Sequence, residues 1–110
     1  MIRTLRTLSV LCLLTVSAGA QLVADFSANV VAGTNPLTVQ FSDGTTGGTP
    51  QAWLWDFGDG SLAQIKNPQH TYTAPGVYDV KLTVGSTTQG SDMELKVGFI
   101  SVAPAVNAAT

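Results

Sequence analysis

The chain has 110 residues, of which 45% are hydrophobic and 11% charged, and its formal net charge at pH 7 is −2. This length fits one domain built around one hydrophobic core. Nucleic-acid binding draws most of its affinity from Lys and Arg side chains on phosphates, so five basic residues against seven acidic ones argue against that function.

Residues 1–20 have the layout of a secretory signal peptide. Arg3 and Arg6 precede an apolar run at residues 8–16, and small residues follow the run at positions 17–20. A helix needs about 20 apolar residues to cross a bilayer, and this run is shorter. We predict cleavage after residue 20 and a secreted or cell-surface protein. The alternative is an uncleaved amphipathic or buried helix.

Cleavage would change both the chemistry and the charge of the chain. It removes Cys12, the only cysteine, and so leaves neither a disulfide nor a thiolate nucleophile or metal ligand. It also removes both arginines, and the remaining three lysines and seven acidic residues give a formal net charge of −4. This acidic balance disfavours anionic membrane surfaces, and we expect no membrane span in the mature chain.

Turn signals divide the rest of the chain into short β-branched and aromatic runs, which is the spacing of an all-β sandwich. The turns are expected at residues 33–36, 43–44, 47–50, 58–60, 75–76, 85–86 and 89–90. Apolar side chains alternate with polar ones in the runs at 22–26, 37–41, 53–57 and 78–84, which predicts strands with one buried face. A last run, at 95–102, is predicted to close the sandwich with Ile100 and Val102 pointing inward. No helix longer than one turn is expected after residue 20.

The part of the chain from Trp53 to Val84 carries an ordered set of motifs. They are Trp55, Asp56, Phe57, Gly58, Asp59 and Gly60, then Pro68, His70 and Tyr72, then Pro75, Gly76, Tyr78, Val80, Leu82 and Val84. This order closely resembles the PKD domain, an extracellular β-sandwich found on cell-surface proteins and secreted hydrolases. The resemblance implies an immunoglobulin-like two-sheet sandwich of about seven strands over residues 21–102. It also implies structural roles for Trp55, Phe57, Gly58, Gly60, His70, Tyr72, Gly76 and Tyr78.

Asp56 and Asp59 lie three residues apart around a glycine turn. Their carboxylates and the loop carbonyls could ligate calcium, the only cofactor that the sequence suggests. The alternative is structural: the Asp side chains cap backbone N–H groups, and Gly58 and Gly60 adopt positive φ. The spacing lacks the alternating acidic ligands of an EF-hand, so it favours the turn.

Four exposed or half-exposed apolar residues are candidates for ligand contact. Trp53 could stack on sugar rings, although it shares a face with the core residue Trp55. Leu54 lies on the opposite face, where it could form a small contact patch with Val77 or Phe99. Leu62 and Ile65 stand where related domains are more often rich in Ser and Thr. They either pack over the end of the sandwich or form an exposed apolar rim.

His70 is the only histidine, and in principle it could act as a general base with Asp56 or Asp59. No candidate nucleophile is spaced to support that role, so a packed or hydrogen-bonded histidine is the better interpretation. Tyr72 is expected to bury its ring and to bond a backbone group through its hydroxyl, similar to the tyrosine corner of related sandwiches. We therefore do not expect an enzyme.

Three functions fit these expectations. The first is a non-catalytic module that contacts extracellular protein or polysaccharide, or that spaces other modules. The second is the front end or remnant of a larger secreted hydrolase or adhesin, suggested by the linker-like composition of residues 103–110. The third is a self-associating surface or matrix protein, because edge strands of a sandwich present unpaired backbone groups. The sequence leaves the oligomeric state open.

Overall fold

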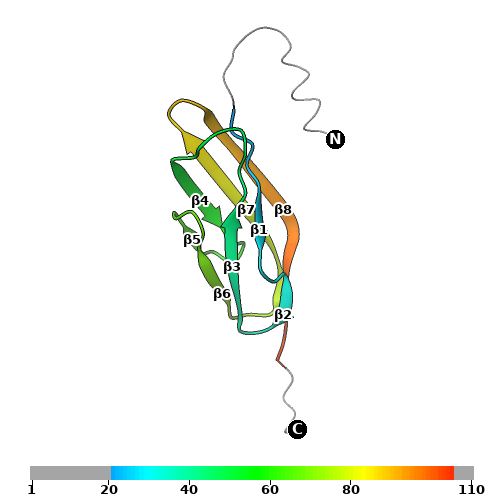
Figure 1. Ribbon diagram of the computed structural model, residues 1–110. Coiled ribbons are helices and arrows are strands. Elements are labelled where there is room, and N and C mark those ends of the chain that lie inside the picture. The colour runs from blue at the N-terminus through cyan, green and yellow to red at the C-terminus, as the bar shows by residue number, and fades with distance from the viewer. Residues whose placement is uncertain (1–20, 106–110) are drawn as a thin grey trace, which may run out of the picture.

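The computed structural model describes residues 21–105, which form eight β-strands and no helix (Figure 1). The predicted signal peptide at residues 1–20, and residues 106–110 of the predicted tail, lie outside the described residues. The strands are β1 (Phe26–Ala28), β2 (Ala32–Thr34), β3 (Leu37–Asp43), β4 (Ala52–Asp56), β5 (Leu62–Ala63), β6 (Gln69–Tyr72), β7 (Gly76–Ser86) and β8 (Gly90–Ala103).

Two sheets make up the domain. One has three strands in the order β1-β3-β6, and the other has five in the order β2-β8-β7-β4-β5. All pairs are antiparallel except β2 with β8, where Ala32–Thr34 run parallel to Ser101–Ala103. The all-β, two-sheet prediction is confirmed. Residues 21–105 form eight strands where the resemblance implied about seven, and two of the eight, β2 and β5, have only three and two residues.

Strand alternation accounts for the core, as predicted. The inward side chains of β7 are fully buried at Val80, Leu82 and Val84, and β8 contributes Ile100 and Val102. Asp79, Lys81 and Thr83, which alternate with the buried residues of β7, lie on the outer side of the five-stranded sheet. The core between the sheets consists of Leu22, Ala24, Phe26, Val39, Phe41, Trp55, Phe57, Tyr72, Val80, Leu82, Val84, Ile100 and Val102.

Trp55 on β4 lies at the centre of the aromatic part of the core. Its ring centroid is 5.1 Å from that of Phe26, in an edge-to-face arrangement, and 5.3 Å from that of Phe41. The indole Nε1 donates a hydrogen bond of 2.9 Å to the carbonyl oxygen of Ile65. Trp55 therefore joins β4 of one sheet to β1 and β3 of the other and to the loop after β5.

Tyr72, at the end of β6, makes the backbone bond expected of it. Its ring is fully buried, and its hydroxyl donates a 2.9 Å hydrogen bond to the carbonyl oxygen of Phe57. Burial raises the pKa of the Tyr72 hydroxyl well above its usual value, and the negative charge of Asp59 adds to the effect. The hydroxyl thus stays protonated and keeps the turn after β4 attached to the three-stranded sheet.

Candidate functional site

The loop after β4 is a hydrogen-bonded turn built from its own carboxylates. The N–H of Gly58 donates to Asp56 Oδ1 at 3.0 Å, and the N–H of Ser61 donates to Asp59 Oδ1 at 3.1 Å. Gly58 and Gly60 have φ angles of 86° and 95°. These contacts agree with the structural interpretation of Asp56 and Asp59, because each carboxylate caps a backbone donor two residues ahead.

His70 on β6 fastens this turn to the three-stranded sheet. Its Nε2 lies 2.7 Å from Asp59 Oδ2, a distance at which the ring N–H donates to the carboxylate. The ring also stacks on Phe57, with centroids 4.2 Å apart, and meets Tyr72 edge-on at 4.7 Å. One face of the imidazole, one of its nitrogens and its contact with Tyr72 thus hold the ring in the fold, which favours a packed histidine over a general base.

Burial and hydrogen bonds have opposite effects on the pKa of Asp59, and the net result is a lowered pKa. Partial burial alone would raise the pKa of this carboxyl, but the bonds from His70 and from the Ser61 N–H, with the charge of His70, lower it below its usual value of 3.8. Because the unfolded chain lacks these bonds, its Asp59 takes up a proton at higher pH than the folded one does. The contribution of Asp59 to stability is therefore complete above about pH 4 and is lost as the pH falls through the folded pKa.

We expect Asp59→Asn to remove part of the acid sensitivity of folding. The native protein should lose stability between pH 5 and pH 3, and the variant, already less stable at neutral pH, should lose less over the same interval. Urea unfolding at both pH values, followed by tryptophan fluorescence, measures the two differences. Equal losses in the two proteins would show that Asp59 does not contribute to the acid response.

The same contacts leave few oxygens for calcium. Both carboxylate oxygens of Asp59 and one of Asp56 already accept hydrogen bonds. In residues 21–105, no group of three or more His, Cys, Asp or Glu side chains is arranged to hold a metal ion. Calcium binding at Asp56 and Asp59 stays a prediction from the sequence, and these contacts favour the turn instead.

Trp53 is partly buried and belongs to the edge of the core. Its ring packs against the core residues, and its Nε1 donates to Asp43 Oδ2 at 3.1 Å. Only part of the ring is therefore available to a ligand. Asp43 also accepts a hydrogen bond from the N–H of Thr45, so the tryptophan is held to the loop that follows β3.

Leu54, Leu62 and Ile65 are exposed to 40%, 62% and 60%. Leu54 points outward from β4, and Leu62 lies on β5 opposite Asp56, at the edge of the five-stranded sheet. Leu62 and Ile65 therefore form an exposed rim and do not pack over the end of the sandwich. Phe99, which the sequence suggested as a partner of Leu54, instead packs on Phe26 at 5.4 Å between the sheets.

The outward side of the five-stranded sheet carries more apolar residues than the sequence reasoning found. We call this surface the outer apolar face, and it consists of Leu54, Leu62, Val77, Met93, Leu95 and Val97. Met93 lies in one row with Thr83 and Leu54, and Leu95 lies in the next row with Lys81. Sequence reasoning missed Met93, Leu95 and Val97 on β8. Their odd-numbered positions were a signal, because successive side chains alternate between the faces of a sheet and the core residues Ile100 and Val102 are even-numbered.

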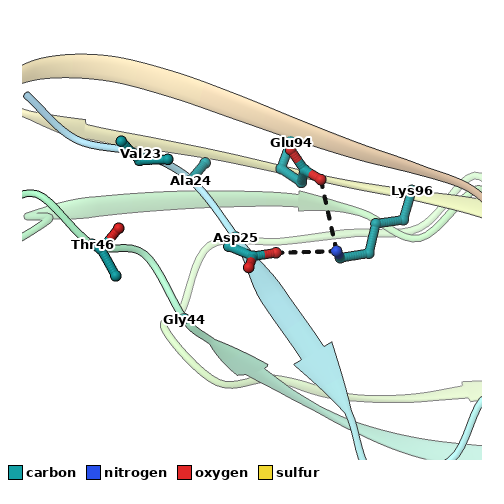
Figure 2. Close-up of a pocket in the computed structure, with 7 residues that line it drawn as sticks. All are labelled: Val23, Ala24, Asp25, Gly44, Thr46, Glu94 and Lys96. Carbon is teal, nitrogen blue, oxygen red and sulfur yellow. Dashed lines mark ion pairs between the residues drawn. The ribbon is translucent and has the colours of Figure 1, made fainter. Parts of the chain in front are cut away.

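A hollow of about 250 Å³ opens between the segment before β1 and the inner side of β8 (Figure 2). Lys96 Nζ lies 3.0 Å from Asp25 Oδ1 and 3.7 Å from Glu94 Oε2, and it sits 5.1 Å from the ring centroid of Phe26. Figure 2 shows the three charged side chains directed toward one another across the hollow. Its other lining residues are Val23, Ala24, Gly44 and Thr46.

Comparison with known proteins connects this chain to one family. A sequence profile of the PKD domain matches residues 15–98. The collagenase ColA of Bacillus cereus is 47% identical over 49 residues, which cover 42% of this chain and 5% of the collagenase. The chain thus spans only a small fraction of this relative.

Solved structures give the same result at the level of the fold. The PKD1 domain of the Vibrio cholerae metalloprotease PrtV superposes with a TM-score of 0.64 at 30% identity, over 76% of this chain and 98% of that domain. A structure of carbohydrate-binding modules from the β-sandwich superfamily superposes with a TM-score of 0.70 at 26% identity. That match covers 79% of this chain and 36% of the other.

Proposed function

We propose that this chain, which belongs to the PKD domain family, acts as a non-catalytic extracellular module that binds protein or polysaccharide. The resemblance drawn from the motifs of residues 53–84 is confirmed. No helix in residues 21–105 is long and apolar enough to cross a membrane. The signal-peptide layout of residues 1–20 supports secretion, and the matched relatives include a collagenase.

The exposed rim of Leu62 and Ile65 carries the binding proposal. Two large aliphatic side chains, each exposed by about three-fifths, lie close in sequence on the short strand β5 and the loop after it. Such side chains gain free energy when a partner removes them from water, at about 25 cal/mol per Å² of apolar area. Leu54, on the adjacent strand β4, extends the same surface, and Trp53 offers part of its ring on the other side of that strand.

Charged and titratable groups nearby support binding rather than catalysis. Asp59 and His70 are engaged with each other and with the turn, and Asp56 caps Gly58.

The carbohydrate-binding modules of similar fold favour polysaccharide as one class of ligand, and the collagenase relative favours collagen as another. Both classes of ligand can be tested with the same protein.

Retention on insoluble chitin, cellulose and collagen tests the proposal. We expect the protein to be retained on at least one matrix and the double variant Leu62→Ser/Ile65→Ser to lose most of that retention. Its fold should persist, because both side chains are exposed. Circular dichroism and urea unfolding check the fold, and parallel assays with and without calcium test for a metal requirement.

Two further variants locate the contact. Val31→Ser is the matched control, because Val31 is 45% exposed but lies outside the rim, and its retention should equal that of the native protein. Trp53→Ala, once its folding is verified, should weaken retention if the tryptophan ring touches the ligand. No retention of the native protein on any matrix would contradict ligand binding of these classes and would favour a spacer role.

A second candidate is that the chain is part of a larger secreted hydrolase or adhesin. The observation that favours it is the size difference, because the matched segment is 5% of the collagenase. The intact mass of the protein recovered from its native culture medium tests it. A mass above that of the whole 110-residue chain would support attachment to further domains.

A further inference from the structure

Strand β8 forms an edge of the five-stranded sheet along most of its length. On one side β7 pairs with it from Gly90 to Val102. On the other side, within residues 21–105, the only named strand is β2, which reaches Ser101–Ala103 at the far end (Figure 1). Residues 90–99 of β8 therefore border the sheet, and an edge strand is a template for pairing with another chain.

The outward side chains of this edge differ from those of a protected edge. Proteins commonly shield edges with outward lysines or with prolines, but residues 90–99 contain no proline. Their outward side chains are Met93, Leu95 and Val97, which are exposed to 48%, 48% and 75%. Apolar side chains along a sheet edge favour association, because a neighbouring strand would remove them from water.

The inward side chains of the same stretch carry both signs of charge. Asp92 accepts a hydrogen bond from the N–H of the buried Ala24, and Glu94 and Lys96 point toward the hollow beside the segment before β1 (Figure 2). Inward charges can disfavour pairing, because an added strand covers them. They disfavour it less when the added strand brings the opposite charge to each of them.

We propose that two copies of this chain pair antiparallel along β8, about a two-fold axis at Leu95, to form one continuous sheet of two five-stranded halves. In this register Glu94 of one copy lies opposite Lys96 of the other, and the reverse pair occurs on the far side of the axis. Met93 lies opposite Val97, and Leu95 meets Leu95. The edge is thus complementary to itself in both charge and apolar character.

Shifting the two-fold axis by one residue in either direction places like charges opposite each other. A two-fold axis at Glu94 would place Asp92 opposite Lys96, but it would also place the two Glu94 side chains opposite each other. An axis at Lys96 would place the two lysines opposite each other. Like charges directly opposite each other destabilise an antiparallel pair. The charge pattern therefore selects the axis at Leu95. This self-association does not depend on the ligand-binding proposal and can hold or fail separately from it.

The mass of the purified protein in solution tests the pairing. Sedimentation equilibrium over a hundredfold range of concentration should show a monomer–dimer equilibrium. Leu95→Lys, which places two added cations at the axis, should raise the dissociation constant by at least about tenfold, equivalent to ~1.4 kcal/mol. Leu54→Lys is the control, because Leu54 lies on the outer apolar face but not at the β8 edge.

A charge exchange gives the sharpest result. Glu94→Lys makes positions 94 and 96 both cationic, and Lys96→Glu makes both anionic, so each variant alone should fail to dimerise. Mixing the two in equal amounts restores opposite charges at every position and should restore the dimer. If Lys96→Glu does not fold because it loses the Asp25 pair, Glu94→Lys and Leu95→Lys alone still test the register.

Three outcomes would overturn the proposal. The protein could remain monomeric across the whole concentration range. Leu95→Lys could dimerise as strongly as the native chain. The third is that Leu54→Lys dissociates the dimer as much as Leu95→Lys does, which would show that the copies pack face to face across the sheet instead.

Discussion

Trp55→Ala is expected to lower the free energy of unfolding by about 3–5 kcal/mol, the range for truncating a large buried aromatic side chain. Trp55 has no exposed surface and contacts the rings of Phe26 and Phe41 from the opposite sheet. The substitution also leaves the carbonyl oxygen of Ile65 without its indole donor. Small domains have total stabilities of about 5–15 kcal/mol, so this change alone could unfold much of the population at 37 °C.

Urea unfolding monitored by circular dichroism measures the effect of Trp55→Ala. Trp53→Ala is the matched control on the same strand, and its effect should be clearly smaller because the Trp53 ring is only partly buried. A loss for Trp55→Ala no greater than that for Trp53→Ala would contradict the central position of Trp55 in the core.

Gly58→Ala is the second large effect, and we expect it to cost about 3 kcal/mol or more. Gly58 has a φ of +86°, and a Cβ atom added there would lie 2.3 Å from the backbone oxygen of Asp79. That oxygen belongs to β7 in the middle of the sheet and cannot move without disturbing the strand. The left-handed backbone conformation adds its own cost of about 1–2 kcal/mol for a residue with a Cβ atom.

Gly60→Ala separates the two causes. Gly60 has a similar φ of +95°, but a Cβ atom there would have nothing within 4 Å. It should therefore show the conformational cost alone, and the difference between the two variants measures the collision with Asp79. Equal losses in Gly58→Ala and Gly60→Ala would mean that the loop moves aside without cost.

The local sequence pattern was sufficient to predict the buried core residues and the turn after β4. Alternation along a strand identifies its buried side directly, so Val80, Leu82 and Ile100 were predicted correctly. The capping by Asp56 and Asp59 was also predictable, because the carboxylate and its backbone partner are two residues apart. The short strands β2 and β5 were not foreseen, since two or three residues carry too little pattern.

The candidate contact surfaces could be identified only once the arrangement of the strands was known. The sequence suggested Leu54, Leu62 and Ile65 as exposed apolar residues, but whether the last two pack or protrude depends on where β5 lies at the sheet edge. It offered Val77 or Phe99 as a partner of Leu54, but the Phe99 side chain packs on Phe26 between the sheets. The pairing of β7 with β8 shifts register close to that point, between Tyr78 and Val80. The alternation at residues 93–97 was visible but could not be assigned to a face without the neighbouring strand.

Residue pattern alone was enough to predict the family, the all-β class, the buried faces of β3, β4 and β7, and the glycine turn after β4. All of these follow from residue types at short spacing, because strand periodicity and turn chemistry act over a few neighbours. The folded structure was needed to learn which strands lie at sheet edges, which apolar side chains remain in water, and that Lys96 meets Asp25. These depend on strand order and register between segments far apart in the chain, which no local pattern encodes.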